Sequence, residues 1–552
     1  MISTSRPRIG MLWGDFPWST PPAKLGKLLS IGRVARDITR ALQDCGQVIP
    51  YCPPQLEQTP SSFSFDMSST THREALTKFL SEIDILWADM YPASAFALTL
   101  RHELNLPCPA ILFAGGTLPK GAEAMLFPWQ HLLRSSDGIL FNCSADQAIW
   151  RRLVQWSTLQ EWIVPLGVDE TIFHSRSSAE CGAIRIQHQF PLHAPILLFV
   201  GRLNIQKNLH ALLYLLTAVR EQVPDVQLCL VGEEDNIMLG EFGVRNTGYV
   251  AWLQALSAEL GVADCVRFMG PLFGEDLARM YAAADVVVNL GFYHRENFGL
   301  AQAEAAACGI PVVCTAWGGF KDVVQEGETG YFVDAVLAKN GIRVNWTRGA
   351  RAVVTLLQQR KLREEMGRRA ASYACEHFSI ASLSVALANV IADVQRVGAQ
   401  THSGVPAYEP SQFAQRYDVH KRACGWYAHD QANRWYPPMF QGQEYELYET
   451  LMQPYATRLA QDVAPEAIKP EWVPYFPSAV KLDSVRLLAS NEDPIWPHRQ
   501  FLTPAEWGIL CMVDGCCSVQ EIATCGTDAD FTTCVTTLWR LYLEGFILFA
   551  DK

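Results

Sequence analysis

The stretch HRENFGLAQAEAAACGIP, residues 294–311, contains a strand-to-helix junction that sets the architecture around it. It comes shortly after DVVVNLG, an apolar run typical of a buried strand, and it ends with a glycine and a proline, which often terminate helices. The alanine-rich part therefore predicts a helix over residues 299–308 that begins at the carboxyl edge of a sheet. Glu304 lies in the second turn of this helix, and Glu296 lies in the loop before it.

The start of this predicted helix is suited to binding an anion. The first backbone N–H groups of a helix lack partners within the helix, and the helix dipole favours negative charge there. Phe298, Gly299 and Leu300 supply this backbone, and the glycine lets a phosphate approach it closely. Glu296 and Glu304 suit sugar hydroxyls, because carboxylates accept charge-assisted hydrogen bonds. The alternative is that both glutamates are solvated or cap the helix.

A second stretch, FVGRLNIQKN at residues 199–208, places two cations at the same edge of the sheet. A strand ends at Gly201, Arg202 follows it, and Lys207 opens the next helix. At about 4 Å from a phosphate oxygen, each cation gains on the order of 4 kcal/mol before desolvation costs. A helix terminus contributes only about 0.3–1 kcal/mol, so the cations should dominate the binding of a diphosphate. Taken singly, each could equally be a surface charge.

The same alternation of apolar strands and amphipathic helices recurs along the first 380 residues, from PRIGMLWGD near the N-terminus to GYFVD. This pattern predicts an α/β fold with two Rossmann-like, doubly wound parallel-sheet domains facing a cleft. After residue 400 the chain becomes rich in tryptophan, tyrosine and proline. The predicted units are an N-terminal domain (1–180), a second domain (190–380), a crossing helix (381–400), an aromatic and proline-rich connection (401–490) and a small helical domain (491–552).

Composition narrows the class of protein. The chain has 552 residues, 49% of them hydrophobic and 18% charged, and a formal net charge of −12, which argues against a nucleic-acid binder. No run of eighteen apolar residues and no signal-peptide pattern occurs, so we expect a cytoplasmic protein. The 16 cysteines form no CxxC pair, which favours reduced thiols and no metal site. No GxGxxG or GxxxxGK[ST] motif occurs, which disfavours dinucleotide and P-loop enzymes.

Taken together, three motifs in one domain resemble a known family. GRLxxxKN (201–208), REN-FGL (295–300) with its second glutamate, and GGFKDVVQEGETGYFV (318–333) occur in that order. This resembles the nucleotide-sugar-binding half of the glycogen synthase-like, family-4-type glycosyltransferases of the GT-B fold. PLGVD (165–169) and FSIASLSVALANVI (378–391) resemble the segments with which that family closes its first domain and crosses back to it.

The resemblance implies roles for five of these residues in holding the donor. Arg202 and Lys207 would bind the donor diphosphate, and the backbone of Phe298, Gly299 and Leu300 would cradle the distal phosphate. Stabilisation of the departing diphosphate would then be the main catalytic contribution of the protein.

The two glutamates would recognise the rest of the donor. The resemblance implies that Glu304 binds the ribose hydroxyls of the nucleotide, and that Glu296 contacts the transferred sugar as a catalytic residue beside Arg202 and Lys207. The family is retaining and usually independent of metal. The resemblance therefore implies a hexosyltransferase that uses a nucleotide sugar as co-substrate and needs no cofactor.

The chain departs from the family pattern at two places. Many relatives carry a histidine after a strand like AILF in the first domain, whereas this chain has Gly115, Gly116 and Thr117 there. This departure puts the first-domain contact with the donor sugar in doubt. Asp322 stands where a glutamate is common, which is a milder change.

The first domain also carries a short basic segment in place of the usual glycine-rich loop. GDFPWSTPPAKLGKLLSIG contains Lys24 and Lys27, and Arg33 follows it directly. These cations could guide an acceptor, or they could form the rim of an ordinary amphipathic helix. A membrane-surface role is also open, although so few charges disfavour it.

The last fifty residues predict helix, turn, helix, helix and a short hairpin. LTPAEWGILCMVDGCCSVQEIA (502–523) with LWRLYLEGFILF resembles the small winged-helix chaperones that bind leader peptides. Residues 441–552 hold 7 Lys and Arg against 16 Asp and Glu, a net charge of −9 that repels phosphate backbones. Peptide binding by strand addition is one hypothesis. A structural or dimerising cap is the other.

The sequence therefore predicts a glycosyltransferase that moves a sugar from a nucleotide sugar to an acceptor, with a peptide, a protein or a glycan as the expected acceptor. Two alternatives stay open, namely a sugar-nucleotide epimerase or phosphorylase on the same fold, and an inactive nucleotide-sugar-binding protein. The base, the sugar and the oligomeric state are not defined by these motifs.

Overall fold

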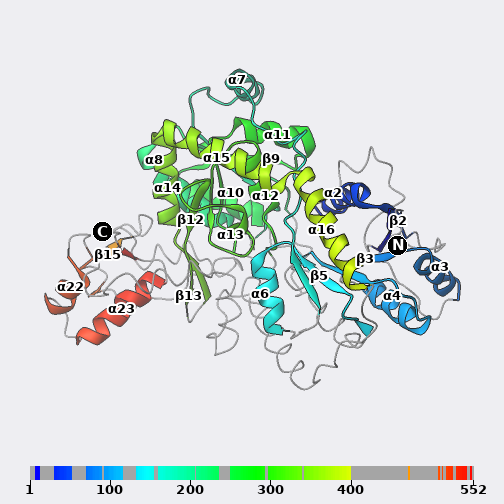
Figure 1. Cartoon of the computed structure of the whole chain (residues 1–552). Coiled ribbons are helices and arrows are strands. Elements are labelled where there is room, and N and C mark those ends of the chain that lie inside the picture. The colour runs from blue at the N-terminus through cyan, green and yellow to red at the C-terminus, as the bar shows by residue number, and fades with distance from the viewer. Residues whose placement is uncertain are drawn as a thin grey trace.

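The chain forms two parallel six-stranded sheets flanked by helices, which confirms the predicted fold class (Figure 1). The structure is a computed structural model. It describes residues 6–12, 30–51, 70–89, 92–115, 132–153, 159–204, 207–234, 249–292, 296–338, 341–398, 470–472, 508–509, 512–513, 517–525, 530–543 and 547–549.

The first sheet is built from short apolar runs separated by helices. Three of its strands are buried along their whole length, as expected for a parallel sheet covered on both faces. Its strands are β1 (Arg8–Leu12), β2 (Gln47–Pro50), β3 (Ile85–Asp89), β4 (Ala110–Ala114), β5 (Gly138–Phe141) and β6 (Gln160–Ile163). Its helices are α2 (Ser30–Cys45), α3 (Thr70–Ser81), α4 (Pro92–Glu103) and α6 (Ser144–Leu153).

The second sheet follows after α7 (Ser178–Gln187). Its strands are β7 (Ile196–Val200), β8 (Gln227–Val231), β9 (Val266–Gly270), β10 (Val286–Asn289), β11 (Val312–Thr315) and β12 (Gly330–Val333). Its helices are α8 (Leu209–Gln222), α10 (Tyr249–Glu259), η3 (Ala263–Cys265), α11 (Gly274–Ala283), α12 (Leu300–Ala307), α13 (Phe320–Val323), α14 (Trp346–Gln358) and α15 (Arg360–Phe378). An antiparallel hairpin, β13 (Ala335–Ala338) with β14 (Gly341–Val344), is inserted before α14.

The two sheets differ in strand order. The first runs β2-β1-β3-β4-β5-β6, whereas the second runs β9-β8-β7-β10-β11-β12. In such sheets a crevice for ligands lies at the point where the strand order reverses. It forms because the loops after the two strands at that point diverge to opposite faces of the sheet. That point lies between β1 and β3 in the first sheet and between β7 and β10 in the second.

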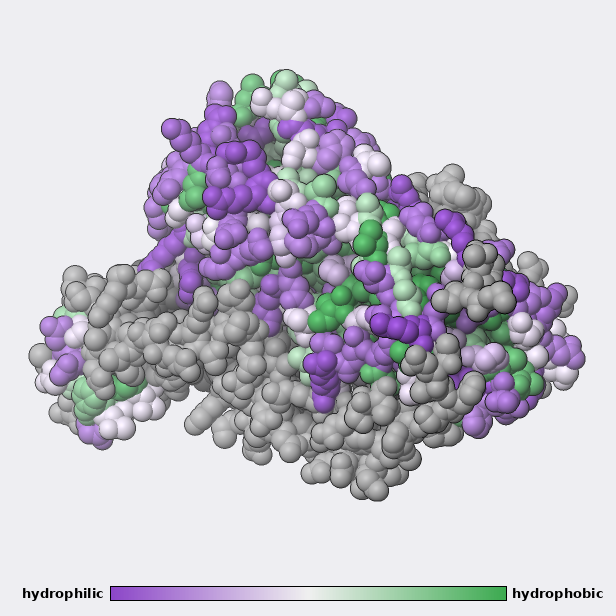
Figure 2. Space-filling view, in the orientation of Figure 1, coloured by the Kyte–Doolittle hydropathy of each residue, from purple (hydrophilic) through white to green (hydrophobic). Residues whose placement is uncertain are grey.

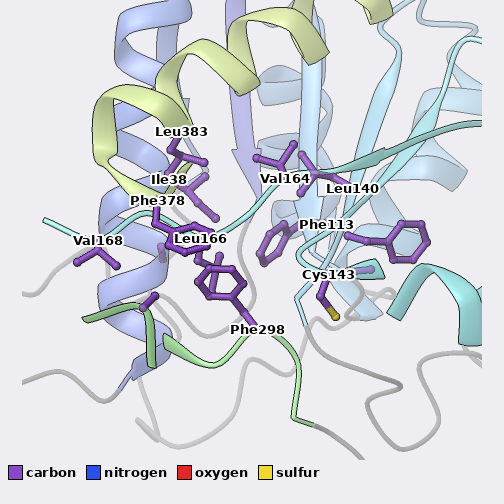
Figure 3. Close-up of a cluster of buried hydrophobic side chains, with 14 of the residues drawn as sticks. Ile38, Phe113, Leu140, Cys143, Val164, Leu166, Val168, Phe298, Phe378 and Leu383 are labelled. Carbon is purple, nitrogen blue, oxygen red and sulfur yellow. The ribbon is translucent and has the colours of Figure 1, made fainter. Parts of the chain in front are cut away.

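One apolar core continues from the first domain into the second. The cluster in Figure 3 joins Ile38 of α2, Phe113 of β4 and Leu140 of β5 to Phe298 and Phe378 of the second domain. The rings of Phe298 and Phe378 meet edge to face, with centroids 5.4 Å apart. This contact anchors the loop before α12 in the junction between the domains.

The chain crosses between the domains twice, and the two crossings pair with each other. The backbone N–H of Val168 donates to the carbonyl of Phe378 at 2.6 Å. Helix α16 (Ile380–Gly398) then returns to the first domain and packs on α2, where Ser384 donates to Asp44 at 2.8 Å. Figure 2 shows hydrophilic residues over the outer helices α14 and α15, and more apolar residues along this junction.

Helix α16 is, among the described residues, the one helix whose length and composition would allow it to cross a membrane. A core helix of a globular domain passes the same test, and one face of α16 is packed against α2. This is therefore weak support for a membrane span.

The C-terminal part contains α22 (Val519–Cys525), α23 (Phe531–Leu543) and β16 (Ile547–Phe549). The sequence predicted a short local hairpin at this end. In the structure the described partner of β16 is β15 (Pro470–Trp472), which lies in the region predicted to be a connection. The pairing is antiparallel and joins segments more than seventy residues apart, so a local pattern could not predict it.

Candidate functional site

The loop after β7 carries both predicted cations. Arg202 follows the strand directly, and its carbonyl accepts the N–H of Asn204 at 3.1 Å. The N–H of Lys207 donates to the carbonyl of Asn204, also at 3.1 Å, so the loop turns sharply before α8. Both residues therefore lie at the carboxyl end of β7, at the reversal point of the second sheet.

The loop after β10 is fixed to its neighbours by side chains from both flanking segments. Asn208 Nδ2 donates to the carbonyl of Leu290 at 3.0 Å, and the Thr315 hydroxyl donates to the carbonyl of Gly291. A Cβ at Gly291 would lie 3.6 Å from Lys207 Cα, so the backbones of the two loops approach closely there. The loops that carry the predicted site residues are thus held side by side.

Lys207 and Glu296 form an ion pair across these two loops. Lys207 Nζ donates to Glu296 Oε2, and both side chains are mostly buried. A cation and a carboxylate held together in this way can bind the same ligand. The cation would contact a negatively charged group of the ligand, and the carboxylate would accept its hydroxyls. The pair places two of the predicted site residues in direct contact.

Gly299 lies at the N-cap of α12 in the left-handed region, with φ 92°. A Cβ there would lie 2.7 Å from Phe320 Cδ1, so both the backbone angle and the space require glycine. Gly318 has φ 50°, and its Cβ would lie 2.7 Å from the carbonyl oxygen of Glu296. The helix start and the Gly318 turn therefore pack tightly around the backbone of residues 296–300.

Glu304 is contacted from both domains. Arg33 of α2 donates from Nη2 to Oε1, and the Tyr281 hydroxyl donates to Oε2 at 3.0 Å. The Glu304 side chain is only 3% exposed and that of Arg33 is 15% exposed. The Arg33 guanidinium also lies over the ring of Phe173, 5.5 Å from its centroid. The pair therefore bridges the domains in a mostly buried environment.

The electrostatics of this cluster follow from burial and from the Glu304 charge. Burial alone would lower the pKa of Arg33, but the charge and hydrogen bond of Glu304 raise it above its usual value. Burial, and next the negative charge of Glu304, raise the pKa of Tyr281 well above the ordinary range. Arg33 is therefore a cation and Tyr281 a neutral hydrogen-bond donor throughout the physiological pH range.

A second contact across the domains lies at the start of α6. Asp322 accepts the backbone N–H of Ser144 at 2.5 Å and the Ser144 hydroxyl at 2.7 Å. A carboxylate from the second domain thus caps a helix of the first. The neighbouring Lys321 is buried, which lowers its pKa to about 8 although the charge of Asp322 acts to raise it.

The structure brings most of the predicted residues to one edge of the second sheet. Arg202 and Lys207 follow β7, whereas Glu296, Phe298, Gly299 and Leu300 follow β10 and lead into α12, which carries Glu304. Lys24, Lys27, Gly116 and Thr117 lie outside the described residues. Within the described part of the chain, no group of three His, Cys, Asp or Glu side chains could hold a metal ion.

Three contacts of the site were not predicted from the sequence. Tyr281, Phe173 and Ser144 lie in ordinary amphipathic or capping positions, and no local motif singles them out. Their partners are distant along the chain; Ser144 and Asp322, for example, are separated by 178 positions. The sequence left open whether Arg33 guides an acceptor or forms the rim of an ordinary amphipathic helix, and the structure places its guanidinium on Glu304.

Comparison with known proteins gives a clear match for the second domain. Residues 182–373 match the family model described as glycosyl transferases group 1. A D-inositol 3-phosphate glycosyltransferase of Thermomonospora curvata is 38% identical over 175 residues, which are 31% of this chain and 39% of that protein. The protein of the same name from Xylanimonas cellulosilytica is 35% identical over 254 residues, 43% of this chain and 57% of the relative. The chain thus spans about half the length of the curated relatives it matches, or less.

Solved structures with a similar fold cover both sheets. A sucrose-phosphate synthase from Thermosynechococcus elongatus has a TM-score of 0.53 and 21% identity, and the match covers 71% of this chain and all of that one. The HepE protein of Anabaena, solved in complex with UDP, has a TM-score of 0.52 and 16% identity, with 70% and 99% covered. These likenesses show the fold, which is the GT-B arrangement of two facing Rossmann-like domains.

Proposed function

We propose that the chain, whose second domain is of the group 1 glycosyltransferase type, is a glycosyltransferase that takes a sugar from a nucleotide-sugar donor. The observation that carries this proposal is the meeting of three features at the reversal point between β7 and β10. These are the cations after β7, the carboxylate of Glu296 and the start of α12. A nucleoside diphosphate sugar offers the matching groups, namely two phosphates, a sugar and a ribose.

The cations would act on the leaving group. When the bond between the sugar and the diphosphate breaks, its electron pair stays on the diphosphate, and Lys207 and Arg202 would neutralise the charge that develops there. The backbone N–H groups of Phe298, Gly299 and Leu300 would orient the distal phosphate. The new bond forms to an acceptor hydroxyl, whose proton is released. No metal ion is needed in this scheme, because side-chain cations supply the positive charge.

The ion pair between Lys207 and Glu296 also positions the carboxylate of Glu296. Because Glu296 is hydrogen-bonded to Lys207, its carboxylate is held at the edge of the diphosphate site, where it can accept hydroxyls of the transferred sugar. Glu304 would bind the ribose hydroxyls. HepE of Anabaena is also solved with UDP-glucose, which supports a nucleotide sugar as the donor class for this fold. Retention of the anomeric configuration is part of the proposal.

The acceptor is proposed to be a peptide or protein presented by the C-terminal part. The named relatives act, by their names, on D-inositol 3-phosphate, but they match less than half of this chain. The described end of this chain carries an antiparallel strand pair, β15 with β16, and two helices, α22 and α23. Removal of residues 399–552 should therefore abolish transfer to the acceptor and leave donor binding intact. We place the reaction in the cytoplasm.

A thermal-shift screen with UDP-, GDP-, ADP- and dTDP-sugars tests the donor class. One of these donors should raise the melting temperature of the wild type, and isothermal titration should then show that Lys207→Ala weakens its binding by about 100-fold, as expected for loss of a phosphate cation worth about 3 kcal/mol. Arg220→Ala is the matched control, since Arg220 pairs with Asp264 on the surface. Equal affinity of wild type and Lys207→Ala for every donor would contradict the proposed site.

A donor labelled in the sugar separates the alternatives. A transferase moves the label to an acceptor, whereas an epimerase leaves it on the nucleotide and a phosphorylase releases it as sugar phosphate. An inactive binding protein leaves the donor unchanged in every fraction.

A further inference from the structure

The proposed ribose-binding carboxylate is already occupied by a side chain of the other domain. Glu304 accepts from Arg33 through Oε1 and from Tyr281 through Oε2. Its side chain is 3% exposed, so the carboxylate is almost completely closed to solvent while Arg33 is in place. A ribose that binds Glu304 must therefore displace one of these two donors.

Arg33 is the donor that can leave. Tyr281 is fixed on α11, where its hydroxyl also donates to the carbonyl of Ala301 at 3.0 Å. Arg33 instead reaches across from α2, and its guanidinium also lies over the face of the Phe173 ring. A long arginine side chain that reaches Glu304 from the first domain has more freedom to move than a tyrosine packed in the same domain as Glu304.

The first domain offers Arg33 a second anion. Asp37 lies four residues further along α2, which places the two side chains on the same face of the helix. Asp37 is buried, and burial raises its pKa although the charges of Arg36 and Arg33 act to lower it. A guanidinium that leaves Glu304 therefore still has a carboxylate nearby, which Arg36 also contacts, and does not become an isolated buried charge.

We propose that Arg33 is a specificity-determining residue of the donor site, which the ribose hydroxyls must replace at Glu304 before the nucleotide is fully bound. This inference rests on the proposed function, because it takes Glu304 as the ribose-binding residue. A nucleotide with ribose hydroxyls can then take over the hydrogen bond that Arg33 makes to Glu304. A nucleotide without them binds beside the closed ion pair.

The arrangement has a measurable consequence for affinity. In the wild type, part of the ribose binding energy is used to separate Arg33 from Glu304, which lowers the apparent affinity for a ribonucleotide. Removing the guanidinium should therefore strengthen the binding of UDP, and leave that of 2′,3′-dideoxy-UDP nearly unchanged. The affinity ratio between the two nucleotides isolates this contribution from any general change in the cleft.

Isothermal titration of the full chain with UDP, GDP and ADP, each beside its 2′,3′-dideoxy form, tests the inference. For the nucleotide that binds, Arg33→Ala should raise the ratio of ribonucleotide to dideoxynucleotide affinity about tenfold. Arg33→Lys should restore the wild-type ratio, since a cation again pairs with Glu304. Arg40→Ala is the matched control, because Arg40 lies on the same helix, is largely exposed and pairs with Asp169.

The outcomes separate the inference from the proposed function. An unchanged ratio in Arg33→Ala, or the same rise in Arg40→Ala, overturns the role of Arg33 and leaves the donor site standing. Equal weakening of both nucleotides by Arg33→Ala shows a purely structural contact and also overturns it. Absence of binding for every nucleotide in the wild type overturns the proposed function, and the inference with it.

Discussion

Two buried ion pairs of this molecule contain the same chemical groups but occupy different surroundings. Arg101 and Asp137 are both fully buried within the first domain. Asp137 accepts hydrogen bonds from two guanidinium nitrogens of Arg101 at 2.7 and 2.8 Å. It also accepts hydrogen bonds from the backbone N–H groups of Ala110 and Arg134. Burial alone would lower the pKa of Arg101, but Asp137 raises it.

The pair between Arg33 and Glu304 differs in where its partners come from. Each residue belongs to a different domain, and the Arg33 side chain keeps 15% of its surface exposed. Asp137 has four protein donors around it, whereas Glu304 has one donor from its own domain and one from the other. The first pair is therefore fixed by the fold, whereas the second can exchange a partner for a ligand.

The largest effect should come from breaking the pair inside the first domain. Asp137→Ala leaves Arg101 as a buried charge without its carboxylate, and we expect a loss of about 3–5 kcal/mol in the free energy of unfolding. Urea denaturation followed by tryptophan fluorescence measures it. Asp264→Ala removes the partner of Arg220 in a surface pair and should cost only about 0.2–1 kcal/mol. A similar cost for the two variants would remove the basis of the comparison.

The sequence was sufficient to predict the two sheets, because their strands are apolar runs at regular intervals. It also placed the cations and Glu296 after the ends of strands, and Glu304 in the helix that follows, since motif positions are local. The order of strands was not accessible in this way. Nothing local distinguishes β2-β1-β3 in the first sheet from β9-β8-β7 in the second, because the order depends on which helix crosses which face.

The contacts across the domains were the part of the site that the sequence could not reveal. Arg33 and Glu304 are 271 positions apart, and each lies in an unremarkable helical pattern. No local pattern indicates that Arg33 faces the second domain, so its basic segment was interpreted either as a guide for an acceptor or as the rim of an amphipathic helix. The same holds for β15 and β16, where two short segments with no shared pattern form one ladder.

A buried histidine of the second domain extends the comparison to pH. His210 lies buried in α8. Its Nδ1 is 3.2 Å from the Tyr249 hydroxyl, and burial lowers its pKa to about 3. Between this value and the unfolded pKa near 6.5 the unfolded chain binds a proton that the native chain does not. Stability should therefore fall as the pH decreases through this window, by about 2 kcal/mol between pH 7 and pH 5.

Denaturation curves of His210→Gln check this contribution. The variant cannot take up the proton, so its free energy of unfolding should change less between pH 7 and pH 5 than that of the wild type. His102→Gln, at the exposed end of α4, serves as the control and should keep the wild-type dependence. The same pH dependence in His210→Gln and in the wild type would show that the imidazole is charged or exposed in the native state.

The smallest effect sharpens the distinction between contacts within a domain and contacts across domains. Asp322 caps α6 from the second domain, whereas Ser177 caps α7 in a capping box with Glu180 three residues further along. Removal of either cap, by Asp322→Ala or Ser177→Ala, should cost about 1 kcal/mol. The two losses should appear at different places in the molecule.

Amide hydrogen exchange locates these losses. Asp322→Ala should speed exchange at the start of α6, in a domain that does not contain the substitution, because the N–H of Ser144 loses its carboxylate acceptor. Ser177→Ala should speed exchange only at its own helix, α7. If α6 keeps its protection in Asp322→Ala, the cap does not stabilise α6 from the second domain. Of the two cross-domain contacts described at the site, only the pair between Arg33 and Glu304 would then couple the domains.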